Sequence, residues 1–330
     1  MAENEPLTRL DFKAAELIAA HPARLVNRNK EVIYAKACPP GCVHRGTLEF
    51  TRWREMRLPN DVPPASPQVD ARAGIYEYSN ADLGCTDWYV NFADEHLFFG
   101  YRGALLAQDE LQIAEHPVLA SLREALLAKK IELNTLHDGR PTPVLITGAE
   151  RRCALALDRN AEQGRPYGLY GNNFGEAPVV AIEKAIRVID PPTVTNLIAI
   201  AAPSNGSGAY SKEEIELILV TAYTGFRAAK LESQRVGGES ARTVIHTGFW
   251  GCGAFGGNRE LIAVLQLLAA RLAGVDRVVF HSFDAAGLQR FEKAHAALDT
   301  LLAEHPRDRL GALIEALAAR GYEWGVSDGT

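Results

Sequence analysis

The chain has 330 residues, of which 47% are hydrophobic and 23% are charged, the balance of an ordinary globular protein. Its net charge of −6 argues against nucleic-acid binding, because no basic field would release counterions from a phosphate backbone. No apolar run approaches the roughly 20 residues of a membrane span, and the acidic N-terminus lacks the pattern of a signal peptide. Five scattered cysteines are typical of a reducing compartment, so we predict a cytoplasmic protein with free thiols.

The first part of the chain shows an apolar spacing typical of a helix between residues 8 and 26: Leu10, Ala14, Leu17, Ile18 and Leu25. A proline-rich segment, residues 58–67, follows and is the best linker candidate. Seventy residues are few for an independent core. We therefore predict a helical accessory extension over residues 1–70, packed on one main domain over residues 71–330.

Within this extension, Cys38, Cys42 and His44 lie close together around the segment Pro39-Pro40-Gly41. Two thiols and an imidazole at this spacing are possible zinc ligands. A neighbouring fourth ligand is missing from the sequence, and Pro-Pro-Gly is equally typical of a plain turn. Both interpretations stay open, with the turn favoured.

Beyond residue 70, apolar strands alternate with amphipathic helices. The sequence predicts strands at 88–92, 144–147, 196–201, 243–248 and 277–283, and helices at 108–129 (broken at Pro117), 212–231, 260–273, 290–302 and 309–320. Residues 151–177 are predicted to be a loop, which contains Tyr167 and Tyr170. Such alternation is typical of an α/β sheet with helices on both faces.

The most informative segment is the glycine-rich stretch between the strand at 243–248 and the helix at 260–273. It contains Gly251, Gly253, Gly256 and Gly257 and ends at Asn258, a good N-cap residue. A strand, a glycine loop and a helix N-terminus in this order offer backbone N–H groups to an anion. We predict a phosphate or diphosphate site here.

The loop has two other interpretations. Gly251-x-Gly253-x-x-Gly256 spells the dinucleotide fingerprint, which would indicate an NAD-dependent oxidoreductase. However, Asp284 follows much later than the usual interval of about 20 residues, and too little chain remains to complete a doubly wound sheet. A purely structural turn is the other alternative, although the bulky Trp250 and Phe255 are unusual choices for a simple connection.

The segment from Trp250 to Gly257, Trp-Gly-Cys-Gly-Ala-Phe-Gly-Gly, resembles the diphosphate-binding loop of the poly(ADP-ribose) glycohydrolases, whose fold is the macrodomain. Further segments in the expected order support the resemblance: residues 90–94 (Val-Asn-Phe-Ala-Asp), 98–100 (Phe-Phe-Gly), 108–110 (Gln-Asp-Glu), 221–226 and 278–284. The resemblance spans roughly residues 75–290. It implies a three-layer α/β/α macrodomain-like fold with a mixed sheet.

The match is divergent in several places. The family has three glycines where this chain has Phe98-Phe99-Gly100, and glutamate where this chain has Asp109. Asp94 stands in place of an asparagine, and Phe249 in place of another. Two phenylalanines restrict the backbone of the turn and add bulk, so we expect a reshaped ligand pocket.

By this resemblance, the chain is an ADP-ribosyl glycohydrolase that cleaves O-glycosidic ribose bonds in poly(ADP-ribose) or protein-linked ADP-ribose. Glu110 is the implied acid/base and Asp109 the implied ribose-positioning carboxylate, with no cofactor and no metal ligand in the site. The implied ligand-binding residues are Gln108, Asp94, Phe92, Gly100, Arg102, Trp250, Gly251, Cys252, Gly253, Ala254, Phe255, Gly256, Gly257 and Phe283. Tyr167 or Tyr170 is a candidate for stacking on adenine. A non-catalytic ADP-ribose reader is the principal alternative.

Overall fold

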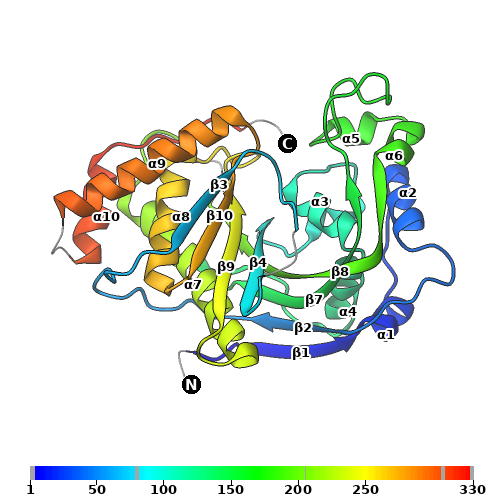
Figure 1. Ribbon diagram of the computed structural model, residues 1–330, viewed down its shortest axis with the longest axis horizontal. Helices are drawn as coiled ribbons and strands as arrows, with labels where there is room; N and C mark the ends of the chain where they lie inside the picture. Colours follow the sequence, from blue (N-terminus) through cyan, green and yellow to red (C-terminus); the bar gives the residue numbers. More distant parts are fainter. Residues whose placement is uncertain (1–3, 79–81, 205, 306–308, 328–330) are drawn as a thin grey trace.

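The computed structural model describes residues 4–78, 82–204, 206–305 and 309–327, and its centre is an eight-stranded sheet (Figure 1). The strand order is β1-β2-β7-β8-β4-β9-β10-β3. These strands are β1 (Thr8–Lys13), β2 (Thr47–Arg52), β3 (Gln68–Arg72), β4 (Cys85–Ala93), β7 (Val144–Leu155), β8 (Ile186–Ala201), β9 (Arg242–Gly248) and β10 (Arg277–His281). Two short strands, β5 (Leu136–His137) and β6 (Arg140–Pro141), pair only with each other.

The sheet is mixed. Strands β1, β2, β7 and β8 pair in antiparallel fashion, whereas β8, β4, β9, β10 and β3 are parallel neighbours. The carboxyl ends of parallel strands meet at one edge of a sheet, and ligands of open α/β folds bind in the crevice there. This edge is therefore the place to look for a site.

Helices cover both faces of the sheet, as Figure 1 shows. One face carries α7 (Lys212–Gly237), α8 (Arg259–Ala273), α9 (Ala285–Glu304) and α10 (Leu310–Ala319). The other carries α1 (Ala14–Ala20), α2 (Arg28–Ala37), α3 (Gln108–Glu115), α4 (Val118–Ala128) and α6 (Val179–Ala185). Alternate residues of β8 serve the two cores: Ile198 packs on the first side and Leu197 on the second, as the period of a strand requires. The predicted three-layer α/β/α fold with a mixed sheet is confirmed.

Local signals located most helices of the main domain correctly. Ser211 caps α7 by accepting a hydrogen bond from the backbone N–H of Glu214 at 3.1 Å, and Pro117 separates α3 from α4. Strands β7 and β8 are longer than predicted, because they form a pair that extends far beyond the rest of the sheet. As a result, residues 151–155, expected in a loop, belong to β7.

The N-terminal region differs from the predicted helical extension. Helices α1 and α2 are present, but residues 8–13 form a strand, and β1 and β2 continue the central sheet beyond β7. Strand β3 forms the opposite edge, so the proline-rich segment 58–67 connects the two ends of one sheet. The predicted extension over residues 1–70 therefore contributes strands as well as helices, and these strands share the hydrogen-bond ladder of the main domain.

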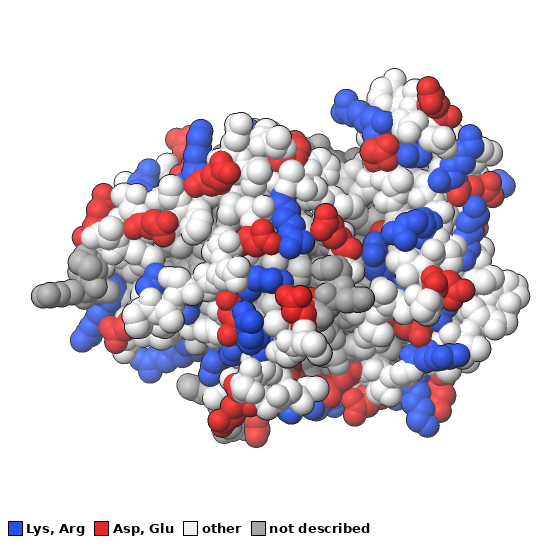
Figure 2. Space-filling model, in the orientation of Figure 1, with Lys and Arg blue, Asp and Glu red and all other residues white. Residues whose placement is uncertain are grey.

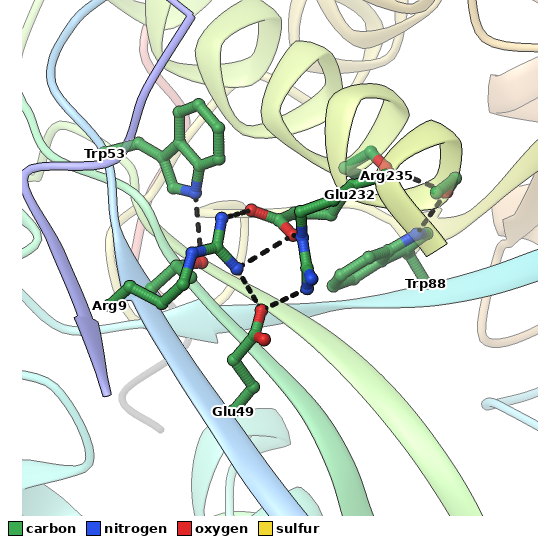
Figure 3. A network of polar contacts seen from close by, with 9 residues as sticks. Arg9, Glu49, Trp53, Trp88, Glu232 and Arg235 are labelled. Carbon is green, nitrogen blue, oxygen red and sulfur yellow. Dashed lines mark hydrogen bonds and ion pairs between the residues drawn. The ribbon is translucent and has the colours of Figure 1, made fainter. Parts of the chain in front are cut away.

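A network of ion pairs ties these N-terminal strands to α7 (Figure 3). Arg9 of β1 contacts Glu49 of β2, and its Nη2 lies 2.5 Å from Oε1 of Glu232 in α7. Arg235 bridges the same two acids, at 2.5 Å from Glu49 and 2.6 Å from Glu232. The side chain of Glu232 is only 2% exposed, so its charge depends on these two arginines.

The molecular surface carries mixed charge. Figure 2 shows lysine and arginine side chains interspersed with aspartate and glutamate over the face in view. Among the described residues, no helix is both long and apolar enough to cross a membrane. Any strongly anionic ligand must therefore be bound by a local arrangement of groups rather than by the overall field of the protein.

We predict that Arg9→Met lowers the free energy of unfolding by about 1–3 kcal/mol, because the buried carboxylate of Glu232 loses one of its charged donors. Denaturant titration of the variant measures this loss. Lys13→Met in the same strand is the matched control. The side chain of Lys13 is 74% exposed, so its replacement should change stability by no more than about 0.5 kcal/mol. Equal stabilities of the two variants would contradict the assigned role of the network.

Candidate functional site

A cavity of about 420 Å³ opens at the carboxyl ends of β4, β9 and β10, within the usual range of roughly 300–1,000 Å³ for small-molecule sites. Its wall is contributed by the segment after β3, the end of β4, the start of α3, the glycine loop and the residues after β10. The residues that line it include Asp94, Gln108, Asp109, Glu110, Tyr170, Gly253, Ala254, Phe255, Arg259 and Phe283.

The cavity begins where two neighbouring strands separate. Strand β9 pairs with β4 only as far as Tyr89, so the backbone of β4 beyond that residue loses a partner on this side. The side chain of Gln108 replaces it: Oε1 accepts from the N–H of Phe92 at 2.7 Å, and Nε2 donates to the carbonyl of Val90 at 3.2 Å. Gln108 thereby fixes the first turn of α3 against β4.

The next two residues of α3 place both carboxyl groups inside the protein. Asp109 and Glu110 are each 6% exposed. Asp109 accepts a hydrogen bond from Nδ2 of Asn91 at 2.9 Å, and Glu110 accepts one from the N–H of Ala107 at 3.0 Å. Burial raises the pKa of both groups; the neighbouring Glu110 raises the pKa of Asp109 further, well above the usual range of an aspartate.

Gly100 is required by the position of Glu110. A Cβ atom at residue 100 would lie 2.1 Å from Oε1 of Glu110, far inside van der Waals contact, so any side chain there would displace the carboxylate. Gly100 does not line the cavity in the structure; it lies behind Glu110, as the only glycine of the divergent turn.

The two phenylalanines of this turn were expected to reshape the ligand pocket, but their rings point elsewhere. Phe98 adopts a left-handed backbone conformation, with φ of 58°, and its fully buried ring joins the core formed with α4. Phe99 is 65% exposed and lies near Arg123, whose guanidinium carbon is 6.0 Å from the ring centroid. Neither ring is part of the cavity wall.

Lys30 of α2 is a charged neighbour of the two carboxyl groups that sequence reasoning missed. It is fully buried, and its ammonium nitrogen makes no hydrogen bond within the described part of the chain. Burial lowers the pKa of Lys30 to about 8, against the opposing influence of Glu110 and Asp109. The positive charge in turn lowers the pKa of Glu110, which burial raises. Only the fold brings α2 here, so no local sequence pattern indicates this neighbour.

The glycine loop forms the opposite wall. Gly251 has φ of 71°, and a Cβ there would lie 2.4 Å from that of Ala202; the N–H of Gly257 closes the loop by donating to the carbonyl of Gly251 at 2.9 Å. Trp250 anchors the loop from below, since its buried indole donates to the carbonyl of Ile200 at 3.0 Å. Three successive amides, Gly253 to Phe255, donate no hydrogen bond within the described residues. They line the cavity as an anion-binding concavity.

The helix after the loop contributes less directly than expected. Asn258 is the predicted N-cap of α8, and its Oδ1 accepts from the N–H groups of Glu260 and Leu261 at 3.1 Å each. These two donors are therefore not free for a ligand, although the helix dipole still points at the loop. Arg259, missed by sequence reasoning, lines the cavity and lies 5.5 Å from the ring of Phe249. It is the cation nearest the loop in sequence.

Aromatic rings close the far end of the cavity. Tyr170 and Phe283 both line it, with ring centroids 5.7 Å apart. Tyr167 is 74% exposed and lies outside the cavity wall. Of the two tyrosines considered from the sequence, Tyr170 is thus the one in position to contact a planar ligand.

Most predicted site residues lie around this one cavity. Those that line it are Phe92, Asp94, Gln108, Asp109, Glu110, Trp250, Gly251, Cys252, Gly253, Ala254, Phe255 and Phe283. Gly256 and Gly257 support the loop without lining the cavity, as Gly100 supports Glu110. Arg102 is not brought to the site: its Nε donates to the carbonyl of Arg24 at 2.6 Å, on the outer side of the turn.

The arrangement also bears on the dinucleotide alternative. The glycine loop does join a parallel strand to a helix, but the three pairs formed among β1, β2, β7 and β8 are antiparallel. Asp284, which that interpretation assigned to ribose binding, caps α9 by accepting from the N–H of Gly287 at 2.7 Å. The mixed sheet, with an anion loop opposite buried carboxyl groups, fits the predicted macrodomain-like fold better than the doubly wound fold of the dehydrogenases.

Part of the chain matches a known protein family. Residues 159–290 match the family model described as poly (ADP-ribose) glycohydrolase (PARG), macro domain fold. This part of the chain is therefore similar to these glycohydrolases, and the resemblance predicted from the glycine loop is confirmed. The matched range includes that loop, whereas the Gln108–Glu110 segment lies outside it.

Two solved structures of poly(ADP-ribose) glycohydrolases align with most of the chain. Poly(ADP-ribose) glycohydrolase from Thermomonospora curvata has a TM-score of 0.47 at 15% identity, covering 85% of this chain and 97% of its own. The enzyme from Deinococcus radiodurans in complex with ADP-ribose has a TM-score of 0.40 at 14% identity, covering 89% and 96%. At such identities, residue roles must be argued from this structure itself.

The buried Asp109 carries a stability cost that depends on pH. Its pKa is raised in the folded state, so its favourable contribution is complete below the unfolded value of about 3.9 and is lost as pH rises through the folded value. We predict that Asp109→Asn increases the free energy of unfolding by about 1–3 kcal/mol at pH 8 and that the gain disappears near pH 4. Denaturant titrations across this range test the prediction.

Asp138→Asn is the control for this series, because the side chain of Asp138 is 91% exposed and lies outside the cavity wall. Its effect on stability should be small at every pH tested. An Asp109→Asn variant that is no more stable than the parent at any pH would show that the burial of this carboxyl group carries no net cost.

Proposed function

We propose that this protein is an ADP-ribosyl glycohydrolase that cleaves O-glycosidic ribose bonds of poly(ADP-ribose) or of protein-linked ADP-ribose. One observation carries the proposal: the buried carboxyl group of Glu110, with its raised pKa, shares one cavity with the free amides of the glycine loop. A carboxyl group that holds its proton near neutral pH can act as a general acid. The loop supplies the binding site for a diphosphate.

The dimensions of the cavity suit a ligand with a diphosphate in the middle. The amides of Gly253 to Phe255 would bind the diphosphate, with Arg259 offsetting its charge. Tyr170 and Phe283 would flank the adenine, while Asp94 and Asp109 would accept hydrogen bonds from ribose hydroxyl groups. This orientation directs the second ribose toward Glu110, at the start of α3.

The reaction needs one residue to act twice. Glu110 donates its proton to the leaving oxygen as the bond between that oxygen and the anomeric carbon breaks. Positive charge develops at the anomeric carbon, and the carboxylate left behind stabilises it. Water then attacks this carbon and gives a proton back to Glu110, which restores the acid. Every step uses groups of the chain and water.

The decisive experiment measures ADP-ribose release from poly(ADP-ribosyl)ated protein by wild type and Glu110→Gln. We predict that the variant loses at least about 100-fold in kcat, the usual contribution of an acid/base residue, and that it still binds free ADP-ribose in calorimetry. Glu95→Gln is the matched control. Glu95 is exposed and lies outside the cavity wall, so this variant should keep full activity.

The outcomes separate the main alternatives. No release by wild type, with ADP-ribose still bound, would leave the non-catalytic reader. Release by both wild type and Glu110→Gln would move the acid/base role to another residue. Binding of NAD in preference to ADP-ribose would favour the oxidoreductase interpretation and contradict the proposal.

Lys30 provides a second test, through the pH dependence of kcat. Its charge lowers the pKa of Glu110, so its removal should raise that pKa and keep the acid protonated to a higher pH. We predict that Lys30→Met moves the alkaline limb of the profile upward by about one pH unit, at the lower end of the shift that a nearby opposite charge produces. An unmoved limb, or one displaced to lower pH, would contradict the assigned coupling.

Lys36→Met is the matched control for Lys30, because Lys36 lies on the same helix but at the surface, where its ammonium donates to the carbonyl of Glu183 at 2.9 Å. Its profile should coincide with that of wild type. Comparing the two methionine variants separates the effect of charge at the site from any general effect of altering α2.

A further inference from the structure

The segment that follows α2 brings three metal-ligating side chains together, away from the cavity. Cys38 is the C-cap residue of α2, and a turn closes when the N–H of Cys42 donates to the carbonyl of Pro39 at 3.0 Å. Gly41 makes this turn possible with φ of 82°. One ligand atom from each of Cys38, Cys42 and His44 lies within 4.8 Å of the others.

The spacing of these atoms suits a small tetrahedral ion. With Zn–S bonds of about 2.3 Å and Zn–N bonds of about 2.0–2.1 Å, neighbouring ligand atoms lie roughly 3.5–3.8 Å apart. Sγ of Cys42 is 3.5 Å from Nε2 of His44. Bringing the most distant ligand atom into place requires a movement on the order of 1 Å, within the reach of a side-chain rotation.

The second ring nitrogen of His44 has the surroundings of a zinc ligand. His44 is 8% exposed, and its Nδ1 lies 3.3 Å from Oε2 of Glu150 in β7. A carboxylate behind the imidazole is the usual outer partner of a zinc-bound histidine, because it orients the ring and strengthens the ligand. The two atoms approach without forming a hydrogen bond, and Nδ1 has no hydrogen-bond partner among the described residues.

Glu150 and Arg152 of β7 fix the segment around His44 to the central sheet. Arg152 pairs with Oε2 of Glu150 at 2.7 Å and also donates to the carbonyl of Val43 at 2.5 Å. The other oxygen of Glu150 accepts from the N–H of Arg45 at 3.0 Å. The turn that carries Cys42 and His44 is thus fastened to the central sheet on both sides of the histidine.

We propose that Cys38, Cys42 and His44 form a zinc site that fixes the carboxyl end of α2 to β7. Two thiolates and an imidazole favour Zn²⁺ over Mg²⁺ or Ca²⁺, which prefer oxygen ligands. Pro39, Pro40 and Gly41 are exposed, so water completes the tetrahedron. The two thiolates neutralise the ion, and Glu150 and Arg152 balance each other behind it.

The proposal is independent of the proposed glycohydrolase activity. Its effect would be structural: α2 carries Lys30 beside the buried carboxyl groups, and Asn29 of the same helix donates to the carbonyls of Phe174 and Ala177 at 2.8 and 2.9 Å. An ion at the end of α2 would hold these contacts in place from the other end of the helix.

Cobalt titration of the full chain, stripped of metal and fully reduced, tests the site without any activity assay. One equivalent of Co²⁺ should produce a thiolate charge-transfer band and the intense visible bands of a tetrahedral ion, and Zn²⁺ should displace it. Cys42→Ser and Cys38→Ser should each weaken binding by more than the 10–100-fold typical of outer-partner substitutions. Glu150→Gln should weaken it by about 10–100-fold.

Cys85→Ser is the matched control, since Cys85 is a free, partly buried cysteine of β4; its cobalt spectrum should equal that of wild type. Circular dichroism of each metal-free variant shows that it is folded. Absence of the charge-transfer band in wild type, or a band that survives Cys42→Ser and Cys38→Ser, overturns the proposal. A disulfide between Cys38 and Cys42 that persists in the presence of reductant also overturns the proposal. Mass spectrometry would detect it as a loss of two hydrogen atoms.

Discussion

The backbone of β4 beyond Tyr89 must find hydrogen-bond partners once β9 separates from it, because buried peptide groups without partners are costly. Two side chains supply them: Gln108 bonds to the N–H of Phe92 and the carbonyl of Val90, and the hydroxyl of Tyr76 donates to the same carbonyl at 2.8 Å. This replacement of a strand by side chains shapes the site. It allows the sheet to open into a cavity without leaving peptide groups unpaired. It also fixes the start of α3, so the next two residues of that helix enter the cavity wall.

Once α3 is held there, the two carboxyl groups must be buried at a cost. Burial opposes ionisation of both Asp109 and Glu110, and the charge of Glu110 also opposes ionisation of Asp109. The fully buried Lys30 partly offsets this cost without forming a closed ion pair. A structure selected for stability alone would place apolar side chains here. Strained electrostatics of this kind concentrate where chemistry needs a proton donor near neutral pH.

The sequence predicted what depends on neighbouring residues and missed what depends on the fold. The glycine loop, the Asn258 cap and the Gln108–Glu110 helix start are local patterns, and each lies where it was expected. Strand β1 was missed although Leu10 and Phe12 alternate with polar residues, because the helical spacing further on was extended back over it. The inward rotation of Phe98 and the approach of Lys30 depend on how α2, α4 and the turn pack, and no spacing along the chain contains that information.

The N-terminal residues consequently belong to the site as well as to the sheet. Strands β1 and β2 extend the ladder beyond β7. Helix α2, the second of the two helices between these strands, carries Lys30 to within electrostatic reach of Glu110. The N-terminal end of that helix is capped by Asn27, whose side chain accepts from the N–H groups of Asn29 and Lys30. Its other end is fastened to β7 through the turn that contains Cys42 and His44. A lysine held at both ends of its helix, and buried without a hydrogen-bond partner, is positioned by the whole fold. Its charge therefore acts on the acid with a fixed geometry, which a surface lysine on a flexible stem would not provide.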